Sequence, residues 1–362
     1  MTRAVKVRDL TIGGGAPVVV QGMTKGDTRD VKGTLDEIAR YQEVGAEVVR
    51  VAVPDMEAAQ AVGPIVKGSQ LPIVADIHFD YRLALEVLRQ GVDKLRLNPG
   101  NIGEASRVET VVKEAKVRGG SYPHRRQRGL AGEDAQDGPR PDGGSARQKR
   151  HEARAHSRGP DFHDIIISLK ASDVPTTLAA YRLMAKTSDY PLHVGLTEAG
   201  ASLGGTVKSA VGIGTLLAEG IGDTIRVSMT GPGEEEIRVA WEILKALKLR
   251  ERGVDIVACP TCGRIQFDMW PVVNELEKRL ASIPETLTVA IMGCAVNGPG
   301  EAKDAKIGIA GGKHMGLLYR DGQIVRRVEQ DQMVEEVWAE VQDVLREART
   351  GAAAVEGDHA SD

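Results

Sequence analysis

Short Val- and Ile-rich runs alternate with amphipathic stretches along the first 250 residues of the 362-residue chain. In the amphipathic stretches an apolar residue recurs every three or four positions, which predicts helices. The strand-like runs are apolar at nearly every position, which is typical of a parallel sheet covered on both faces. Seven of them can be read, at 17–23, 47–53, 71–77, 94–98, 164–170, 193–197 and 224–230.

Seven strands with a gap in the middle of the series predict an α/β fold, a (β/α)8 TIM-like barrel over residues 1–250. An open, doubly wound sheet is the alternative. Residues 251–348 predict a smaller α/β domain with its own strands and a closing helix, and the small, polar residues 349–362 predict a flexible tail.

Composition and charge exclude several classes of protein. The formal charge is −4, from 47 basic and 51 acidic residues, so general binding to nucleic acid or to a membrane surface is not expected. No apolar run approaches the roughly 18 residues that span a bilayer, and the N-terminus lacks the apolar core of a secretory signal. We therefore expect a cytoplasmic protein.

Polar side chains recur at the predicted strand ends. In a barrel these ends form the mouth of the active site, so we expect the set to line one cavity. Any single member could be a solvated loop residue, but that explanation does not suit the whole series. Cations mixed with hydroxyls and carboxylates suit a phosphorylated small molecule. The set comprises Arg50, Asp76, His78, Arg96, Asn98, Lys170, Thr197, Glu198, Arg226, Ser228 and Thr230.

The three cysteines of the chain predict a metal site. Cys259 and Cys262 form a CxxC pair after one predicted strand, and Cys294 follows another. An odd, sparse count argues against a disulfide framework. Three thiolates, with Glu301 nearby in a Gly-Pro-Gly-Glu turn, suit a [4Fe-4S] cluster whose fourth iron is held weakly. A zinc site, which prefers a fourth Cys or a His, and a redox dithiol are the alternatives.

Several sequence blocks carry a resemblance. In chain order they are VADIHFD, LRLNPGNIG, IIISLKASD, GLTEAG, GIGDTIRVSMTG, CPTCGR and GCAVNGPGEA. Together they resemble bacterial 4-hydroxy-3-methylbut-2-enyl diphosphate synthase across nearly the whole chain. The resemblance implies a barrel joined to a reductase-like domain with a [4Fe-4S] cluster. It also implies reductive ring opening and dehydration of 2-C-methyl-D-erythritol 2,4-cyclodiphosphate in non-mevalonate isoprenoid biosynthesis, with electrons from flavodoxin or ferredoxin, in a homodimer.

The resemblance also assigns roles to residues. It makes Cys259, Cys262 and Cys294 the cluster ligands, with Glu301 on the fourth iron. We expect the three sulfurs to lie within about 7 Å of one another, as a cluster requires. The remaining residues divide by the part of the substrate they meet. Arg50, Arg96, Lys170 and Ser228 would hold the diphosphate; Asp76, His78 and Glu198 would lie near the methylerythritol part; and Asn98 and Asn297 would contact substrate.

Residues 119–161 do not fit this pattern. Leu130 is the one residue among them drawn from Val, Ile, Leu, Met, Phe and Trp, whereas the segment holds eight Arg and eight Gly. This composition is typical of a disordered basic linker, yet the segment occupies the place of the fifth βα unit. We therefore predict an irregular segment and a barrel that is open or misfilled there.

A pair of compensating frameshifts explains the segment. With suitable synonymous codons, residues 123–132 read in a shifted frame as RIGVNAGSL, the strand that the resembling family has at this point. A natural disordered insertion is the alternative. On this interpretation the chain is an inactive or damaged homologue of the enzyme. A zinc-binding regulatory protein is a further alternative, disfavoured by the phosphate-type residues at the strand ends.

Overall fold

The computed structural model describes residues 1–97, 105–119, 129–132, 162–296 and 298–358. It divides into two compact units, Met1–Glu251 and Arg252–Asp362, which are described separately below. None of the helices in the described part of the chain has both the length and the apolar character of a membrane span.

The first unit is built on one eight-stranded parallel sheet in the order β8-β7-β6-β5-β4-β3-β10-β9. Its two outer strands also join, because Ile167 and Leu192 form a parallel bridge and the Ile167 N–H donates to the Pro191 carbonyl at 2.9 Å. The sheet therefore closes on itself as a barrel, which excludes the doubly wound alternative. The strands are β3 (Val19–Met23), β4 (Val48–Ala52), β5 (Ile73–Ile77), β6 (Lys94–Leu97), β7 (Gly129–Gly132), β8 (Ile165–Ile167), β9 (His193–Val194) and β10 (Thr224–Ile225).

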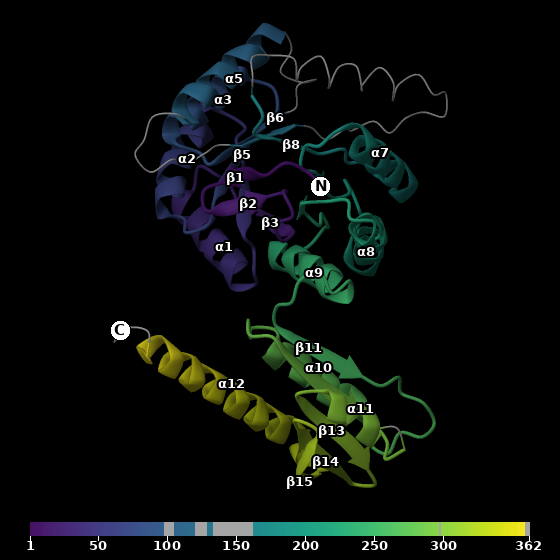
Figure 1. The fold of residues 1–362 in the computed structure, drawn as a ribbon. Helices are drawn as coiled ribbons and strands as arrows, with labels where there is room; N and C mark the ends of the chain where they lie inside the picture. Colours follow the sequence, from purple (N-terminus) through teal and green to yellow (C-terminus); the bar gives the residue numbers. More distant parts are fainter. Residues whose placement is uncertain (98–104, 120–128, 133–161, 297, 359–362) are drawn as a thin grey trace. The chain divides into compact units, whose positions relative to one another are not determined.

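Helices surround this barrel on its outer side (Figure 1). They bury a continuous core against the outward-facing strand residues, among them Val49, Ala75 and Leu95. Asp30, Asp55, Asp80 and Asp173 each cap a helix that follows a strand, by accepting a backbone N–H of its first turn. The helices are α1 (Val31–Glu43), α2 (Met56–Gly68), α3 (Tyr81–Gln90), α5 (Ala105–Gly119), α7 (Val174–Thr187), α8 (Ser202–Ala218) and α9 (Gly233–Ala246).

Apolar side chains close the lower end of the barrel, which is the end at which its strands begin. An antiparallel hairpin of β1 (Val5–Val7) and β2 (Leu10–Ile12) contributes Val5, Val7 and Ile12 to a separate buried cluster. The other members are the first inward residues of four strands, Val19, Val48, Val74 and Ile166. Alternate residues of a strand share one face, so the residues two and four positions further along these strands also point into the barrel.

The prediction for residues 119–161 is wrong where the structure describes them. Gly129–Gly132 form β7, which pairs in parallel with β6 through Leu95↔Leu130 and with β8 through Leu130↔Ile165. Strand pairing uses backbone N–H and C=O groups, and the two neighbouring strands offer such groups on both sides, so a short run of small residues can complete the sheet. The barrel is thus neither open nor misfilled at this strand. The frameshift interpretation concerns codons and stays a prediction, although a strand in this segment counts against it.

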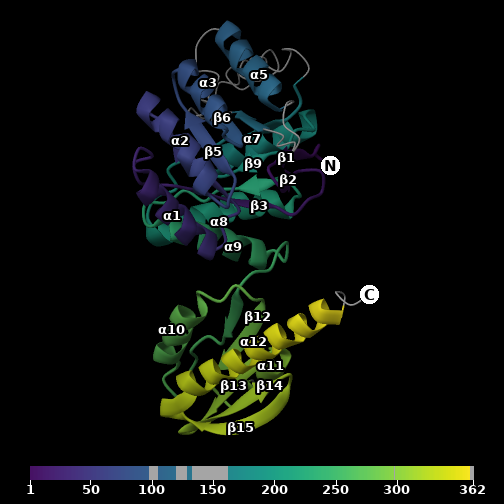
Figure 2. The same ribbon diagram turned by 90° about the vertical axis from the view of Figure 1, so that its left-hand side faces the viewer.

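The second unit contains a five-stranded mixed sheet in the order β11-β12-β13-β14-β15. Helices α10 and α12 bury one face of this sheet in a core that includes Leu276, Ile291, Ile309 and Val337, whereas Ala302 of α11 packs on the opposite face (Figure 2). The elements are β11 (Val254–Ala258), α10 (Met269–Leu280), β12 (Leu287–Met292), α11 (Gly298–Asp304), β13 (Ile307–Gly312), β14 (Met315–Arg320), β15 (Gln323–Glu329) and α12 (Met333–Asp358), with a 3-10 turn at Gln330–Gln332. Helix α12 continues to Asp358, past residue 349, where the flexible tail was expected to begin.

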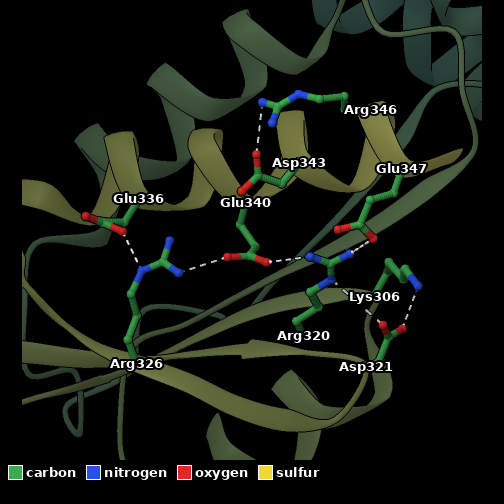
Figure 3. Close-up of polar contacts among 9 residues, drawn as sticks. All are labelled: Lys306, Arg320, Asp321, Arg326, Glu336, Glu340, Asp343, Arg346 and Glu347. Carbon is green, nitrogen blue, oxygen red and sulfur yellow. Dashed lines mark hydrogen bonds and ion pairs between the residues drawn. The ribbon is translucent and has the colours of Figure 1, made fainter. Parts of the chain in front are cut away.

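A buried carboxylate ties α12 to this sheet (Figure 3). Glu340 is 3% exposed, and its two oxygens lie 3.2 Å from Arg320 of β14 and 3.1 Å from Arg326 of β15. Arg326 also pairs with Glu336 at 2.6 Å, and Arg320 pairs with Glu347. The two arginines therefore join about three turns of α12, from Glu336 to Glu347, to the neighbouring strands β14 and β15.

We expect Glu340→Ala to lower the free energy of unfolding of this unit by about 1–3 kcal/mol, because the change leaves two arginines without their shared buried partner. Hydrogen exchange of α12, followed by mass spectrometry, should become faster. Asp343→Ala removes an exposed pair with Arg346 and serves as the matched control, with an expected loss below about 1 kcal/mol. Equal effects of the two changes would contradict the assignment.

Candidate functional site

Asp76 is the centre of an ion-pair cluster inside the barrel. It is 1% exposed, and Arg96 of the neighbouring strand β6 donates to its Oδ1 at 2.8 Å. The Nε of Arg50 on β4 lies 3.5 Å from its Oδ2, and His78 Nε2 lies 3.3 Å from the same oxygen. The structure thus brings together four of the residues predicted from their strand-end positions.

The register explains this convergence. Arg50 pairs with Val74 and Asp76 pairs with Arg96, so alternate residues of β4, β5 and β6 place their side chains at similar heights in the barrel. Burial by itself would raise the pKa of Asp76, but Arg50, His78 and Arg96 outweigh it and hold the pKa of this carboxyl well below its usual range. Asp76 is therefore ionised throughout the neutral range.

Further polar side chains are buried on the inner face of the barrel. Lys170 is 2% exposed, and its side chain lies close to Gly195, where an added Cβ would meet Lys170 Cε at 3.1 Å and the Arg226 carbonyl oxygen at 2.5 Å. His193 is buried on the same inner face, and burial together with Lys170, Lys94 and Arg50 lowers its pKa well below the usual value. The barrel interior therefore carries a surplus of positive charge, in a place that branched apolar side chains usually fill.

The remaining predicted residues of the barrel are less buried. Glu198 is exposed and has a left-handed backbone with φ 55°, an uncommon conformation that is concentrated at functional sites. Ser228 is half-buried after β10, on the same face of the strand as Arg226. Asn98 and Asn297 lie outside the described residues.

Lys94 and His193 are inward-facing residues that the predicted site did not include. The prediction selected strand ends, whereas these two are the first residues of their strands. For Lys94 a signal was available, because it lies two positions before Arg96 and alternate residues of a strand share one face.

In the second unit, the parallel pairing of β11 and β12 brings two cysteine loops together. Ala258 pairs with Ile291, so Cys259 and Cys294 follow the same edge of the sheet. The Cys259 Sγ accepts the Gly293 N–H at 3.2 Å, which places this sulfur beside the residue that precedes Cys294. Cys259, Cys262 and Cys294 form no disulfide.

Arg264 interacts with Cys262. Its backbone N–H and its side chain both bond to Cys262 and lower the pKa of that thiol, and the hydrogen bond to Cys262, with a smaller electrostatic effect of Cys294, raises the pKa of Arg264. Glu301 is exposed on α11. Among the described residues, no three His, Cys, Asp or Glu side chains are arranged to hold a metal ion. The convergence of the three sulfurs and Glu301 on one metal therefore stays a prediction.

Comparisons with known proteins agree with this two-unit division. Residues 2–241 match the GcpE TIM-barrel domain, and residues 255–343 match the GcpE protein C-terminal domain. A relative from Geobacter sulfurreducens is 53% identical over 96% of this chain and 98% of its own length. Another from Symbiobacterium thermophilum is 52% identical over 92% of this chain and 90% of its own. Both relatives are named 4-hydroxy-3-methylbut-2-en-1-yl diphosphate synthase (flavodoxin).

We expect Asp76→Asn to lower the free energy of unfolding by about 3 kcal/mol, because Arg50 and Arg96 lose their buried counter-ion. Asp76 has a lowered folded pKa, so its contribution is complete above its unfolded pKa of about 3.9 and is lost as the pH falls from about 5 towards 2. The difference between the two proteins in urea unfolding should therefore shrink over that range. Asp189→Asn, which breaks an exposed pair with Arg3, is the control and should cost less than about 1 kcal/mol.

We expect iodoacetamide to alkylate Cys262 first in the metal-free protein, because Cys262 is exposed and its pKa is lowered, whereas Cys294 is buried. Peptide mapping by mass spectrometry under anaerobic conditions measures the rates. Arg264→Gln should slow the reaction of Cys262, and Arg346→Gln, far along the chain on α12, should leave it unchanged. Equal rates at Cys262 and Cys294 would show that the local geometry is wrong.

Proposed function

Because this chain belongs to the GcpE family, we propose that it is a 4-hydroxy-3-methylbut-2-en-1-yl diphosphate synthase that takes its electrons from flavodoxin. The reaction opens the ring of 2-C-methyl-D-erythritol 2,4-cyclodiphosphate and removes one oxygen as water. It consumes two electrons and two protons. The substrate is a small, strongly anionic molecule, and the site must bind this anion while it excludes solvent.

The observation that carries the proposal is the buried cationic interior of the barrel. Arg50 and Arg96 are both less than a tenth exposed, and Asp76 neutralises at most one of them. Lys170 adds a third buried cation. Guanidinium and ammonium groups in a water-poor site form strong charge-assisted bonds to phosphate oxygens, so an anionic ligand offsets the repulsion among them. Ser228 would donate its hydroxyl to the same diphosphate.

The carboxylate and imidazole groups suit the other end of the substrate. Asp76 is held ionised, so it accepts hydrogen bonds from substrate hydroxyls and fixes the orientation of His78. Glu198 stands at the mouth with an exposed carboxylate. A proton that leaves with the departing oxygen can come from either His78 or Glu198, and Asn98 and Asn297 would add contacts to substrate.

We assign the second unit to a [4Fe-4S] cluster in a reductase-like domain. The donor set fits, because three cysteines that form no disulfide follow the adjacent parallel strands β11 and β12, and Arg264 bonds to one of them, Cys262. Cys259, Cys262 and Cys294 would hold the cluster, and Glu301 would hold its fourth iron until substrate displaces it. When bound, the cluster passes single electrons from flavodoxin to the substrate. A homodimer, with ferredoxin as a second possible donor, belongs to the same proposal.

The inactive-homologue alternative has lost its structural basis in part. It rested on a missing fifth strand, and β7 supplies a strand at that position. Cytoplasmic localisation suits a donor such as flavodoxin and remains part of the proposal.

We expect anaerobic reconstitution with iron and sulfide to yield a visible absorption band and, after reduction, an electron paramagnetic resonance signal from a cluster. The reconstituted enzyme, supplied with reduced flavodoxin, should convert the cyclodiphosphate at a rate of about 0.1–10 per second. Cys259→Ser should lose both the absorption band and turnover. Arg96→Met should keep the absorption band and lower kcat/KM by about a hundredfold or more, since it removes a charged contact. A zinc-loaded protein without visible absorption would refute the cluster assignment.

A further inference from the structure

Lys94 is the deepest cation of the barrel interior that the described residues include. It is the first residue of β6 and is 1% exposed. Leu95 packs in the outer core with the helices, so Lys94 shares the inner face with Arg96. Its strand neighbours in the sheet are Val74, which belongs to the cluster at the sealed end, and Gly129 of β7. Lys94 thus lies directly beneath the ion-pair cluster around Asp76.

Positive charge dominates its surroundings. The titratable and charged groups on the inner faces of the surrounding strands and just beyond their ends are Arg50, Asp76, Arg96, Asp164, Lys170, His193 and Arg226. Asp76 is engaged by Arg50 and Arg96. Burial, followed by repulsion from Arg50, lowers the pKa of Lys94 to about 7, so its charge is marginal at neutral pH.

A second observation at the same depth points to a ligand. The Nε2 atom of His193 is buried and has no hydrogen-bond partner in the described structure, while its Nδ1 lies 3.4 Å from Thr224 Oγ1. A buried polar atom without a partner costs folding free energy, and so does a buried lysine that no carboxylate neutralises. A methionine would fill the space of Lys94 without that cost. Binding of an anion would explain why a lysine is present instead.

We propose that Lys94 is a further binding residue for the diphosphate group of the substrate and that it takes up a proton from solvent when the anion enters the barrel. The inference rests on the proposed function, since it deepens the diphosphate site. An anion within a few ångströms reverses the effect of Arg50 and favours the ammonium form. The neutral imidazole of His193 would meanwhile donate its Nε2–H to an oxygen of the ligand, while its Nδ1 accepts the hydroxyl of Thr224.

Calorimetric titration with inorganic pyrophosphate on the full chain tests this proposal. Titrations near pH 7.5, in two buffers with different ionisation enthalpies, give the number of protons taken up on binding. Pyrophosphate itself also takes up protons on binding, but this contribution is the same for all variants. It therefore cancels when the proton uptake of one variant is subtracted from that of another. Wild type should take up a fraction of a proton more than Lys94→Met, whose affinity should be about tenfold weaker. Lys94→Arg should keep the affinity and lose the additional uptake, because arginine stays charged.

Thermal unfolding separates this role from a structural one. Lys94→Met should unfold at a higher temperature than wild type without ligand, because it removes a buried charge. The stability of wild type relative to Lys94→Met should improve between pH 7 and about 10, where the unfolded lysine binds more protons than the folded one. A lysine that merely supports the fold would show a loss of stability on replacement. Lys186→Met, at an exposed position on α7, is the control for all measurements.

These measurements test the role of Lys94 separately from the proposed diphosphate site. Pyrophosphate binding that is equal in wild type and Lys94→Met, with equal proton uptake, would overturn the role of Lys94 and leave the diphosphate site standing. Wild type that fails to bind pyrophosphate at millimolar concentration would overturn both. Lower stability of Lys94→Met together with unchanged binding would identify Lys94 as a structural residue and overturn the proposal.

Discussion

The buried carboxylate of Asp76 is the interaction on which the barrel interior depends. Like-charged guanidinium groups do not lie side by side in a water-poor space unless something of opposite charge separates them. Asp76 does this for Arg50 and Arg96, with contacts of 3.5 and 2.8 Å. It stabilises the pair while it leaves the interior with net positive charge. The barrel thus folds around an interior whose positive charge is only partly neutralised.

In the second unit, parallel strand pairing brings distant residues of the chain together. Neighbouring parallel strands end at one edge of the sheet, so side chains that are far apart in the chain come close together there. Cys259 and Cys294 are 35 positions apart, yet the Gly293 N–H lies 3.2 Å from the Cys259 sulfur. The ion-pair network around Glu340 fixes α12 on the outer strands of the same sheet.

The sequence was sufficient to predict those strands whose residues form a clear apolar run. Uninterrupted apolar runs marked the barrel strands other than β7, and polar residues at their ends led to Arg50, Asp76, His78 and Arg96. Strand β7 escaped prediction because Gly129–Gly132 has almost no apolar signal, and its place depends on backbone bonds to β6 and β8. Lys94 and His193 escaped because they lie within strands, where a polar residue in an apolar run has no visible partner until the barrel closes.

The hairpin of β1 and β2 has a consequence for the order of events during turnover. Its Val5, Val7 and Ile12 plug the lower end of the barrel. A ligand held by the inner cations must then enter and leave through the opposite end of the barrel, where the strands finish. Substrate and product of the proposed reaction both carry a diphosphate, so the outgoing molecule blocks the incoming one. Product must therefore dissociate before the next substrate molecule can bind. The rate of product release then contributes to the turnover rate together with the rate of the chemical steps.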